Sequence, residues 1–164
     1  MEEIETYKQE VEKNPDDAEA HYNLGVAYYD SGKYQEAIEA CKQVIRLDPD
    51  DAKVHNNLAA AYGKSGKYQE EIESYKQAIK IDPDYVKAHC NLGIAYGKSG
   101  KYKEAIDAFK QAIRINPDYS EAHFNLGIAY LILKDNGSAL EQYEILKNLD
   151  PYLANLLFEE INSE

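Results

Sequence analysis

The chain of 164 residues contains no tryptophan and only two cysteines, and it lacks a long apolar run. Its longest apolar stretch lies around Tyr130–Leu133, far short of the roughly 20 residues that a transmembrane helix needs, so we expect no direct membrane insertion. No basic and apolar leader follows Met1, so we expect a cytoplasmic protein, with loss of a leader by truncation as the alternative. Cys41 and Cys90 fall at different positions of the pattern described below, which argues against a disulfide and suits a reducing compartment.

The chain also lacks an excess of positive charge. It has 18 Lys and Arg residues against 30 Asp and Glu residues, a formal net charge of −12. Binding to duplex nucleic acid needs a broad cationic face, so we expect no nucleic-acid partner. Residues 86–119 are locally basic, with six basic residues against three acidic ones, which leaves a small basic surface open there.

Patterns for catalysis and metal binding are missing as well. The four histidines occupy equivalent positions of successive units: His21, His55, His89 and His123. Equivalent atoms of packed helices lie about 10 Å apart, whereas zinc ligands lie about 2 Å from the metal, so we expect a packing role. Gly63-Lys64-Ser65 and Gly97-Lys98-Ser99 resemble the end of a phosphate-binding loop, but the first glycine of that loop is missing. Serines lie in turns and carboxylates are spread apart, so we predict no enzyme, no metal and no cofactor.

What the chain does have is a period of 34 residues, marked by five prolines: Pro15, Pro49, Pro83, Pro117 and Pro151. Such a period is typical of stacked helical units, none of which can bury its apolar face alone. Each unit opens with an amphipathic first helix, in which leucine and tyrosine recur at helical spacing, as at Leu24 and Tyr28. A Ser-Gly-Lys turn follows in three units, and a second helix, for example Gln35–Leu47, ends before Asp-Pro or Asn-Pro.

Glycine interrupts three of the first helices, at Gly25, Gly93 and Gly127. Each costs about 1 kcal/mol relative to alanine, so we expect the paired helix to cross closely there. The residues predicted to face these glycines are small and belong to second helices: Ala37, Ala105 and Ala139. The second unit departs from this pattern, with Ala59 in place of the glycine and Glu71 in place of the alanine.

The recurring pattern L-G-x-x-Y, then G-x-Y-x-x-A, an aromatic, and Ala before Asp-Pro resembles the tetratricopeptide repeat (TPR) family over nearly the whole chain. The resemblance implies an all-α, right-handed superhelical solenoid of antiparallel helix pairs, whose first helices line a concave groove. We expect one continuous domain made of a truncated N-terminal repeat, four full repeats, and a capping helix with a tail. Their predicted ranges are residues 1–17, 18–51, 52–85, 86–119, 120–153 and 154–164.

Both ends of the chain depart from the repeat. Ile4, Tyr7 and Val11 align with the inward residues of a second helix, so residues 1–13 predict a second helix that has no first helix before it. After Pro151, apolar residues recur at helical spacing and predict a short capping helix: Leu153, Leu156, Leu157 and Ile161.

An asparagine directly precedes the recurring leucine of every first helix: Asn23, Asn57, Asn91 and Asn125. A side-chain amide offers a donor and an acceptor, so a row of amides is suited to the backbone of an extended ligand. The H-x-N-L string resembles the superhelix of O-linked N-acetylglucosamine transferase, which implies an asparagine ladder that holds substrate backbones. The alternative is that each amide bonds within the protein, to the neighbouring repeat.

Further candidates for a ligand face share the asparagines' side of the first helices by helical spacing. One set precedes the asparagines, and one set lies a turn further on: Tyr22, Asn56, Cys90 and Phe124, then Val26, Ala60, Ile94 and Ile128. Lysines flank the middle two repeats: Lys53, Lys64, Lys87 and Lys98. We therefore predict a groove for a peptide with apolar anchors and an acidic centre.

The favoured function is a non-enzymatic scaffold that binds an extended or helical peptide segment of a partner protein. The carboxylate clamp of TPR cochaperones is not matched, because Tyr22 and Val26 stand at its first two positions. The alternative is self-assembly, in which the N-terminal helix and the apolar Leu131–Leu133 segment let chains stack end to end or dock into one another's grooves. An engineered consensus array is disfavoured by drift between the repeats, such as the altered Lys134–Gly137 turn.

Overall fold

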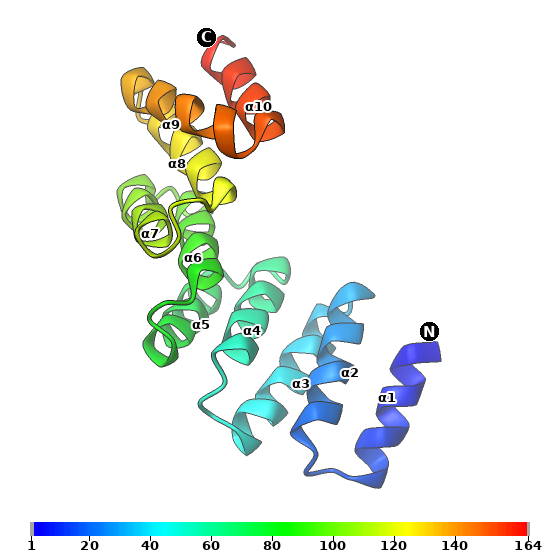
Figure 1. Cartoon of the computed structure of the whole chain (residues 1–164). Coiled ribbons are helices and arrows are strands. Elements are labelled where there is room, and N and C mark those ends of the chain that lie inside the picture. The colour runs from blue at the N-terminus through cyan, green and yellow to red at the C-terminus, as the bar shows by residue number, and fades with distance from the viewer. Residues whose placement is uncertain (1, 164) are drawn as a thin grey trace. The chain divides into compact units, whose positions relative to one another are not determined.

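The computed structural model describes residues 2–163, and every regular element in that range is an α-helix (Figure 1). The chain divides into two compact units, unit 1 (Met1–Pro83) and unit 2 (Asp84–Glu164). Unit 1 contains, in chain order, α1 (Glu2–Lys13), α2 (Ala18–Asp30), α3 (Tyr34–Leu47), α4 (Ala52–Lys64) and α5 (Tyr68–Ile81). Unit 2 contains α6 (Val86–Lys98), α7 (Tyr102–Ile115), α8 (Ser120–Ile132), α9 (Asn136–Leu149) and α10 (Pro151–Ile161).

Consecutive helices pack against each other within each unit. In unit 1, α2 pairs with α3 and α4 pairs with α5 across short turns, while α1 packs on α2 and α3 packs on α4. In unit 2, α6 pairs with α7 and α8 pairs with α9, α7 packs on α8, and α10 packs on both α8 and α9. This arrangement confirms the predicted all-α array of helix pairs with a capping helix at its C-terminal end.

Helix boundaries follow local side-chain chemistry. Asp17 and Asp51 cap the first helices of unit 1, because each carboxylate accepts hydrogen bonds from backbone N–H groups two and three residues later. The predicted second-helix ends are confirmed, since the C-cap of each second helix is the residue before proline: Asp48, Asp82, Asn116 and Asp150.

The turns inside three helix pairs place glycine in the left-handed region. Gly32, Gly66 and Gly100 have φ values of 74°, 74° and 72°, the left-handed conformation in which glycine commonly ends a helix. In the fourth pair Lys134 takes the same place with φ 61°, and it is the one non-glycine residue with positive φ among residues 2–163. A side chain with a Cβ is strained in this conformation, so this turn is locally less favourable than the other three.

The N-terminal helix α1 packs its apolar side on α2. Ile4 is buried against Leu24 and Ala27 of α2, and Tyr7 and Val11 pack against the same cluster. The amphipathic pattern of the first residues is therefore used to cover α2.

The prediction that the side chains of Ala37, Ala105 and Ala139 fill the space opposite the helical glycines is wrong. A Cβ on Gly25 would lie 3.3 Å from the Cβ of Ala40, and Ala37 offers only its carbonyl oxygen, at 3.8 Å. The space at Gly93 is filled by the ring of Phe109, and the space at Gly127 by Leu157 of α10. Ala105 and Ala139 are fully buried, but they are not the nearest neighbours of these glycines.

The capping helix α10 starts directly at Pro151, because the Asp150 side chain accepts hydrogen bonds from the N–H groups of Tyr152 and Leu153. It therefore includes the last residues that we assigned to the fourth repeat. Leu157 is fully buried, and it clusters with Leu146 of α9 and Ala154 of α10. The predicted stripe is confirmed for Leu153 and Ile161, which pack against this cluster.

Candidate functional site

The asparagines of the ladder are half-exposed, but at least two of them also bond within the protein. The Asn57 side-chain N–H donates to the hydroxyl of Tyr22 at 3.3 Å, which joins α4 to α2. The Asn125 side-chain N–H donates to the carbonyl of Glu121 at 2.8 Å, one turn back on its own helix. Asn125 also hydrogen-bonds Cys90, so it links α8 to α6. The contacts of Asn57 with Tyr22 and of Asn125 with Cys90 are bonds between neighbouring first helices, as the alternative interpretation predicted.

The residue before each asparagine in the sequence faces the next first helix, where both helices belong to the same unit. Tyr22 meets Asn57, Cys90 meets Asn125, and Phe124 packs against the apolar cluster that α10 completes. Asn56 is 3 % exposed and Cys90 is fully buried, so their assignment to a ligand surface is wrong. The physical reason is that their side chains fill space between helices, where no ligand can reach them.

Asn23 differs from the other asparagines of the ladder. Its side chain is half-exposed and makes no side-chain hydrogen bond within the described range, residues 2–163. The equivalent Asn57, by contrast, donates a hydrogen bond to Tyr22 of α2. The amide of Asn23 thus keeps its donors and its acceptor for solvent or a ligand.

Apolar and basic side chains surround these amides in unit 1. Val26 lies one turn after Asn23 and is 37 % exposed, which is high for a valine, and Ala60 holds the equivalent place on α4. Lys53 and Lys64 are exposed at the two ends of α4. We call Asn23, Val26, Asn57 and Ala60 the α2–α4 face.

The equivalent side chains of unit 2 are more involved in packing. Ile94 packs against the apolar cluster that includes Phe109 and Leu126, and Ile128 packs against the cluster that includes Leu157. Lys87 and Lys98 are exposed, as their counterparts are in unit 1. At the positions equivalent to Val26 and Ala60, the side chains of unit 2 are therefore engaged in packing.

His21, His55 and His123 each contact a backbone carbonyl oxygen, which is a structural role. His21 and His123 are buried, and Nε2 of each lies 2.8 Å from the carbonyl oxygen of the proline six residues earlier. His55 makes the same contact to Pro49 at 3.1 Å. The ring of His123 also contacts the side-chain oxygen of Gln142 through Nδ1, at 2.8 Å. Each of these rings holds the turn before a first helix against that helix.

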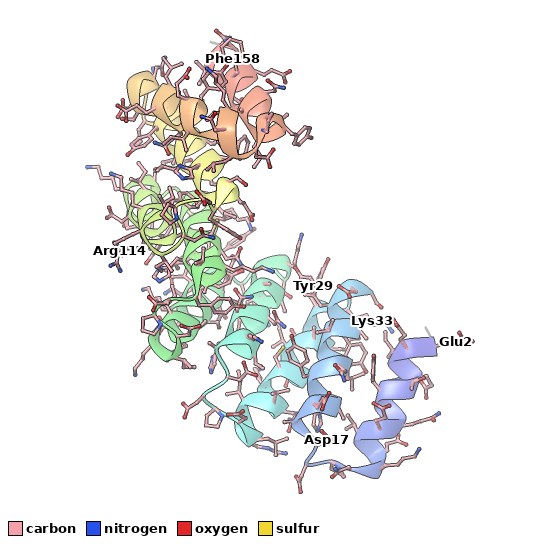
Figure 2. All side chains as sticks on the ribbon, in the orientation of Figure 1. Glu2, Asp17, Tyr29, Lys33, Arg114 and Phe158 are labelled. Atoms are coloured by element: carbon pink, nitrogen blue, oxygen red, sulfur yellow. The ribbon has the colours of Figure 1, made fainter. Side chains whose placement is uncertain are left out.

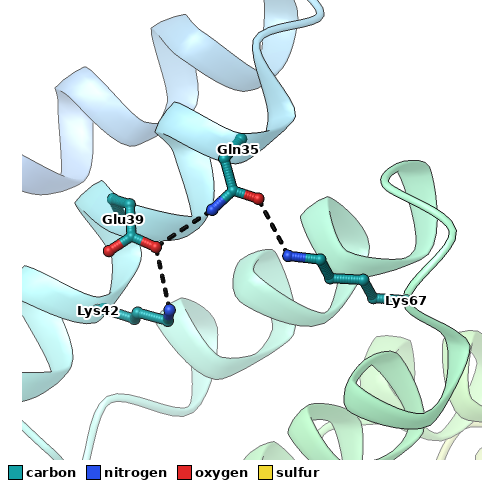
Figure 3. A network of polar contacts seen from close by, with 4 residues as sticks. All are labelled: Gln35, Glu39, Lys42 and Lys67. Atoms are coloured by element: carbon teal, nitrogen blue, oxygen red, sulfur yellow. Dashed lines mark hydrogen bonds and ion pairs between the residues drawn. The ribbon is translucent and has the colours of Figure 1, made fainter.

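The sequence patterns did not predict one polar network on the surface of unit 1 (Figure 3). Glu39 accepts hydrogen bonds from Gln35 and Lys42 on α3, and Lys67 reaches from the start of α5 to the Gln35 oxygen at 3.0 Å. The spacing along α3 is visible in the sequence, but the contact of Lys67 depends on how two helix pairs pack. All four side chains are exposed or half-exposed, so the network contributes little to stability.

Both cysteines are free and buried. Burial raises the pKa of Cys41 to about 11 and that of Cys90 to about 12; Glu121 raises the latter further, and the hydrogen bond from Asn125 opposes the rise. The thiolate, which is the reactive form, is therefore strongly disfavoured in both.

The described residues hold no cluster of three or more His, Cys, Asp or Glu side chains with the arrangement of a metal site. Across residues 2–163, no helix has the combined length and apolar character to cross a membrane.

Paired helices with a 34-residue period, glycine turns and proline-terminated second helices define a helical repeat protein. Two tetratricopeptide repeat models match the sequence, one over residues 18–51 and 86–119, the other over residues 40–73 and 108–141. A TPR repeat model matches residues 64–100. The chain belongs to the tetratricopeptide repeat family, whose members are in general non-enzymatic protein-interaction scaffolds.

No curated protein matches the chain. Among solved structures, MamA is 27 % identical with a TM-score of 0.82, covering 96 % of this chain and 87 % of that one. TTC0263 from Thermus thermophilus, a thermophilic TPR protein, is 22 % identical with a TM-score of 0.78, covering 96 % and 88 %. YrrB, described as a TPR protein with an unusual peptide-binding site, is 20 % identical with a TM-score of 0.79, covering 95 % and 81 %. The last two likenesses show the fold alone.

Proposed function

We propose that this protein is an interaction scaffold whose α2–α4 face binds an extended or helical segment of a partner protein. The observation that carries the proposal is the amide of Asn23, which is half-exposed and makes no side-chain hydrogen bond among residues 2–163. An amide in this state can bond a ligand backbone without first breaking a bond inside the protein.

Apolar side chains beside the Asn23 amide offer a ligand further contact. Val26 offers exposed apolar surface one turn from Asn23, and Ala60 leaves room beside Asn57 for a partner's side chain. Asn57 uses one side-chain N–H for Tyr22 and retains a second N–H, so it can serve the same ligand. YrrB, which shares the fold, is described as having a peptide-binding site.

Charge suggests the chemistry of the segment. Lys53 and Lys64 are exposed at the ends of α4, so a segment that crosses α4 would meet a cation near each end of this helix. We infer a ligand with apolar anchors and an acidic centre, because opposite charges at the edge of an interface favour encounter.

The test uses a peptide selected from a random display library on the full chain, with affinity measured by calorimetry. Replacing Asn23 by alanine should weaken binding by about 1–3 kcal/mol if the amide pairs with a buried ligand backbone. Asn125→Ala is the matched control, because that amide already bonds its own helix. Tyr22→Phe separates a ligand contact of Asn57 from the loss of its internal partner. Unchanged affinity in Asn23→Ala and Asn57→Ala would remove the proposal.

The acidic centre has a separate test. Lys53→Glu should lower affinity in a salt-dependent manner, whereas Lys87→Glu, the equivalent change in unit 2, should have a smaller effect. Equal affinity of Lys53→Glu and the unmodified chain at low salt would contradict an acidic ligand.

Self-assembly remains the alternative function, and one observation favours it. Ile132 and Leu133 at the end of α8 are 49 % and 43 % exposed. The N-terminal part of that hypothesis has less support, because Ile4 is only 6 % exposed and already packs against α2. Light scattering over a concentration series tests it, with Ile132→Glu expected to abolish any growth in mass.

A further inference from the structure

The C-terminal end of unit 2 carries large apolar side chains on its surface. On α9 and α10, Leu140 is 43 % exposed, Ile145 is 40 % exposed and Phe158 is 46 % exposed. Figure 2 labels Phe158 on α10. Several large apolar side chains gathered on two neighbouring helices are unusual on a protein surface and often mark an interaction site.

Leu140, Tyr143 and Phe158 lie on one surface. The rings of Tyr143 and Phe158 lie 5.2 Å apart, which joins α9 to α10. Leu140 precedes Tyr143 by three residues, so the two share a side of α9. We call Leu140, Tyr143 and Phe158 the α9–α10 patch.

Leu140 occupies a position that is buried in every earlier repeat. Its equivalents at 34-residue spacing are exposed by 0 %, 3 % and 8 % in turn: Ile38, Ile72 and Ile106. Ile38 is covered by Val54 and Leu58 of the following first helix, α4, and Ile106 clusters with Ala122 and Leu126 of α8. A helix is therefore what covers this position elsewhere in the chain.

The capping helix does not cover Leu140 in the same way. α10 begins directly at Pro151, whereas the earlier first helices begin three residues after proline, at Ala18, Ala52, Val86 and Ser120. Its main contact, Leu157, instead fills the space beside Gly127 of α8. The place above Leu140 that a helix fills elsewhere is thus open to solvent.

Acidic side chains border the patch. Glu141, Glu144, Glu159 and Glu160 are all exposed on the same two helices. Residues 120–164 contain eight carboxylate residues and two lysines, and one of these lysines, Lys147, pairs with Glu144 at 2.8 Å. A second copy of this chain, with a net charge of −12, would bring further carboxylates toward this border. A basic partner is favoured electrostatically.

We propose that the α9–α10 patch docks an amphipathic helix of a partner protein, whose apolar stripe is flanked by lysine and arginine. The apolar stripe covers Leu140 and Phe158, and the flanking cations face the glutamates. This surface lies in unit 2, and it is separate from the α2–α4 face of unit 1.

The experiment measures binding of two synthetic helical peptides to the full chain by fluorescence anisotropy. Both carry leucine at i, i+3, i+4 and i+7; one has lysine at the flanking positions and the other has glutamate. The lysine peptide should bind at least about tenfold more tightly at low salt, and the difference should shrink as ionic strength rises. Equal binding of the two peptides, or no binding of the lysine peptide, would overturn the proposal.

Variants locate the contact. Leu140→Gln combined with Phe158→Gln should lower the affinity for the lysine peptide by about tenfold or more, because central apolar side chains contribute most of the binding energy of such interfaces. Tyr68→Gln is the matched control, because Tyr68 is 52 % exposed but belongs to α5 of unit 1.

Circular dichroism verifies that the double variant keeps its helices; if it does not, Glu141→Lys with Glu159→Lys tests the same patch through charge. Equal losses in the double variant and the Tyr68 control would contradict the assignment. A concentration-dependent mass that the double variant abolishes would identify a second copy as the occupant, and would also overturn the proposal.

Discussion

Helices α1 and α9 expose side chains of opposite character. In α1, the positions equivalent to those at which α3 has Ala37, Ala40, Val44 and Leu47 hold exposed polar residues: Glu3, Thr6, Glu10 and Lys13. In α9, Leu140 and Ile145 remain apolar and exposed, although α10 covers part of the same pair. α1 therefore exposes polar side chains at these positions, whereas α9 exposes apolar ones. This difference is why we place the further docking site at the C-terminal end.

Equivalent residues also have different neighbours and different burial in units 1 and 2. Opposite Gly25 lie small groups of Ala40 and Cys41, while opposite Gly93 lies the ring of Phe109. His55 makes one contact at a half-exposed place, while His123 makes two contacts in a buried one. Equivalent substitutions in the two units should therefore have unequal effects.

The largest difference is expected at the histidines. His123→Leu removes both ring contacts and leaves the buried Gln142 oxygen without its partner, which should cost about 2–3 kcal/mol of unfolding free energy. His55→Leu removes one contact at a half-exposed site and should cost about 1 kcal/mol. Urea denaturation of both variants measures the difference. Equal costs would mean that the two histidines contribute alike despite their different burial.

A smaller difference is expected at the helical glycines. A Cβ on Gly93 would lie 2.5 Å from the Phe109 ring, so Gly93→Ala should cost about 1–2 kcal/mol through overpacking. Gly25→Ala meets its nearest atom at 3.3 Å, and better helix propensity should offset most of the strain, for a change near 0 within about 0.5 kcal/mol. Thermal melts measure both variants. The double variant Gly93→Ala/Phe109→Leu should recover part of the loss, and no recovery would contradict a clash with the ring.

One substitution in a turn is expected to stabilise the protein. Lys134→Gly relieves a positive φ of 61° and should raise the free energy of unfolding by about 1 kcal/mol. Gly100→Lys, the reverse change in the same unit, should lower it by a similar amount, because φ is 72° there. Denaturant midpoints of the two variants test whether the first is stabilised and the second destabilised. A destabilised Lys134→Gly variant would indicate that the lysine side chain contributes more than its backbone strain costs.

The last comparison concerns the cysteines of the two units. With pKa values raised to about 11 and about 12, the thiolate fractions of Cys41 and Cys90 at pH 8 are lower than in an ordinary thiol by about a hundredfold and about a thousandfold. Alkylation should therefore proceed through opening of each unit, with Cys41 reporting on unit 1 and Cys90 on unit 2. Mass spectrometry of the labelled chain gives both rates. Rates equal to those of an exposed thiol would show that burial does not protect either site.

The same shifts give a pH dependence with a definite sign. A raised folded-state pKa means that the neutral thiol is preferred in the fold. The stabilisation is complete below the ordinary thiol pKa near 9 and is lost as pH rises through about 11 to 12. Replacing both cysteines by alanine should remove this part of the alkaline destabilisation, which pH-dependent denaturation measures.

The fold was largely predictable, and the candidate site much less so. A 34-residue period, glycine turns and Asp-Pro or Asn-Pro endings are local signals, so they predicted the helix pairs, their turns and the capping helix. The ligand face was predicted from helical spacing alone, and spacing does not say which neighbour covers a side chain. The predictions for Asn56 and Cys90 were wrong for this reason, because both side chains lie on the predicted ligand side of their helices but are covered. The repeat boundaries and the groove stay predictions.

The sequence by itself determined the helices, because capping carboxylates, left-handed glycines and prolines act on the few residues beside them. Tertiary structure decided which residues face the helical glycines, which amides are free and which apolar side chains stay exposed. Phe109 and Leu157 fill spaces that the repeat pattern assigned to alanines, and Asn23 keeps a free amide that Asn57 does not. These outcomes depend on side-chain volume and on the neighbouring helix, and a residue's own repeat specifies neither.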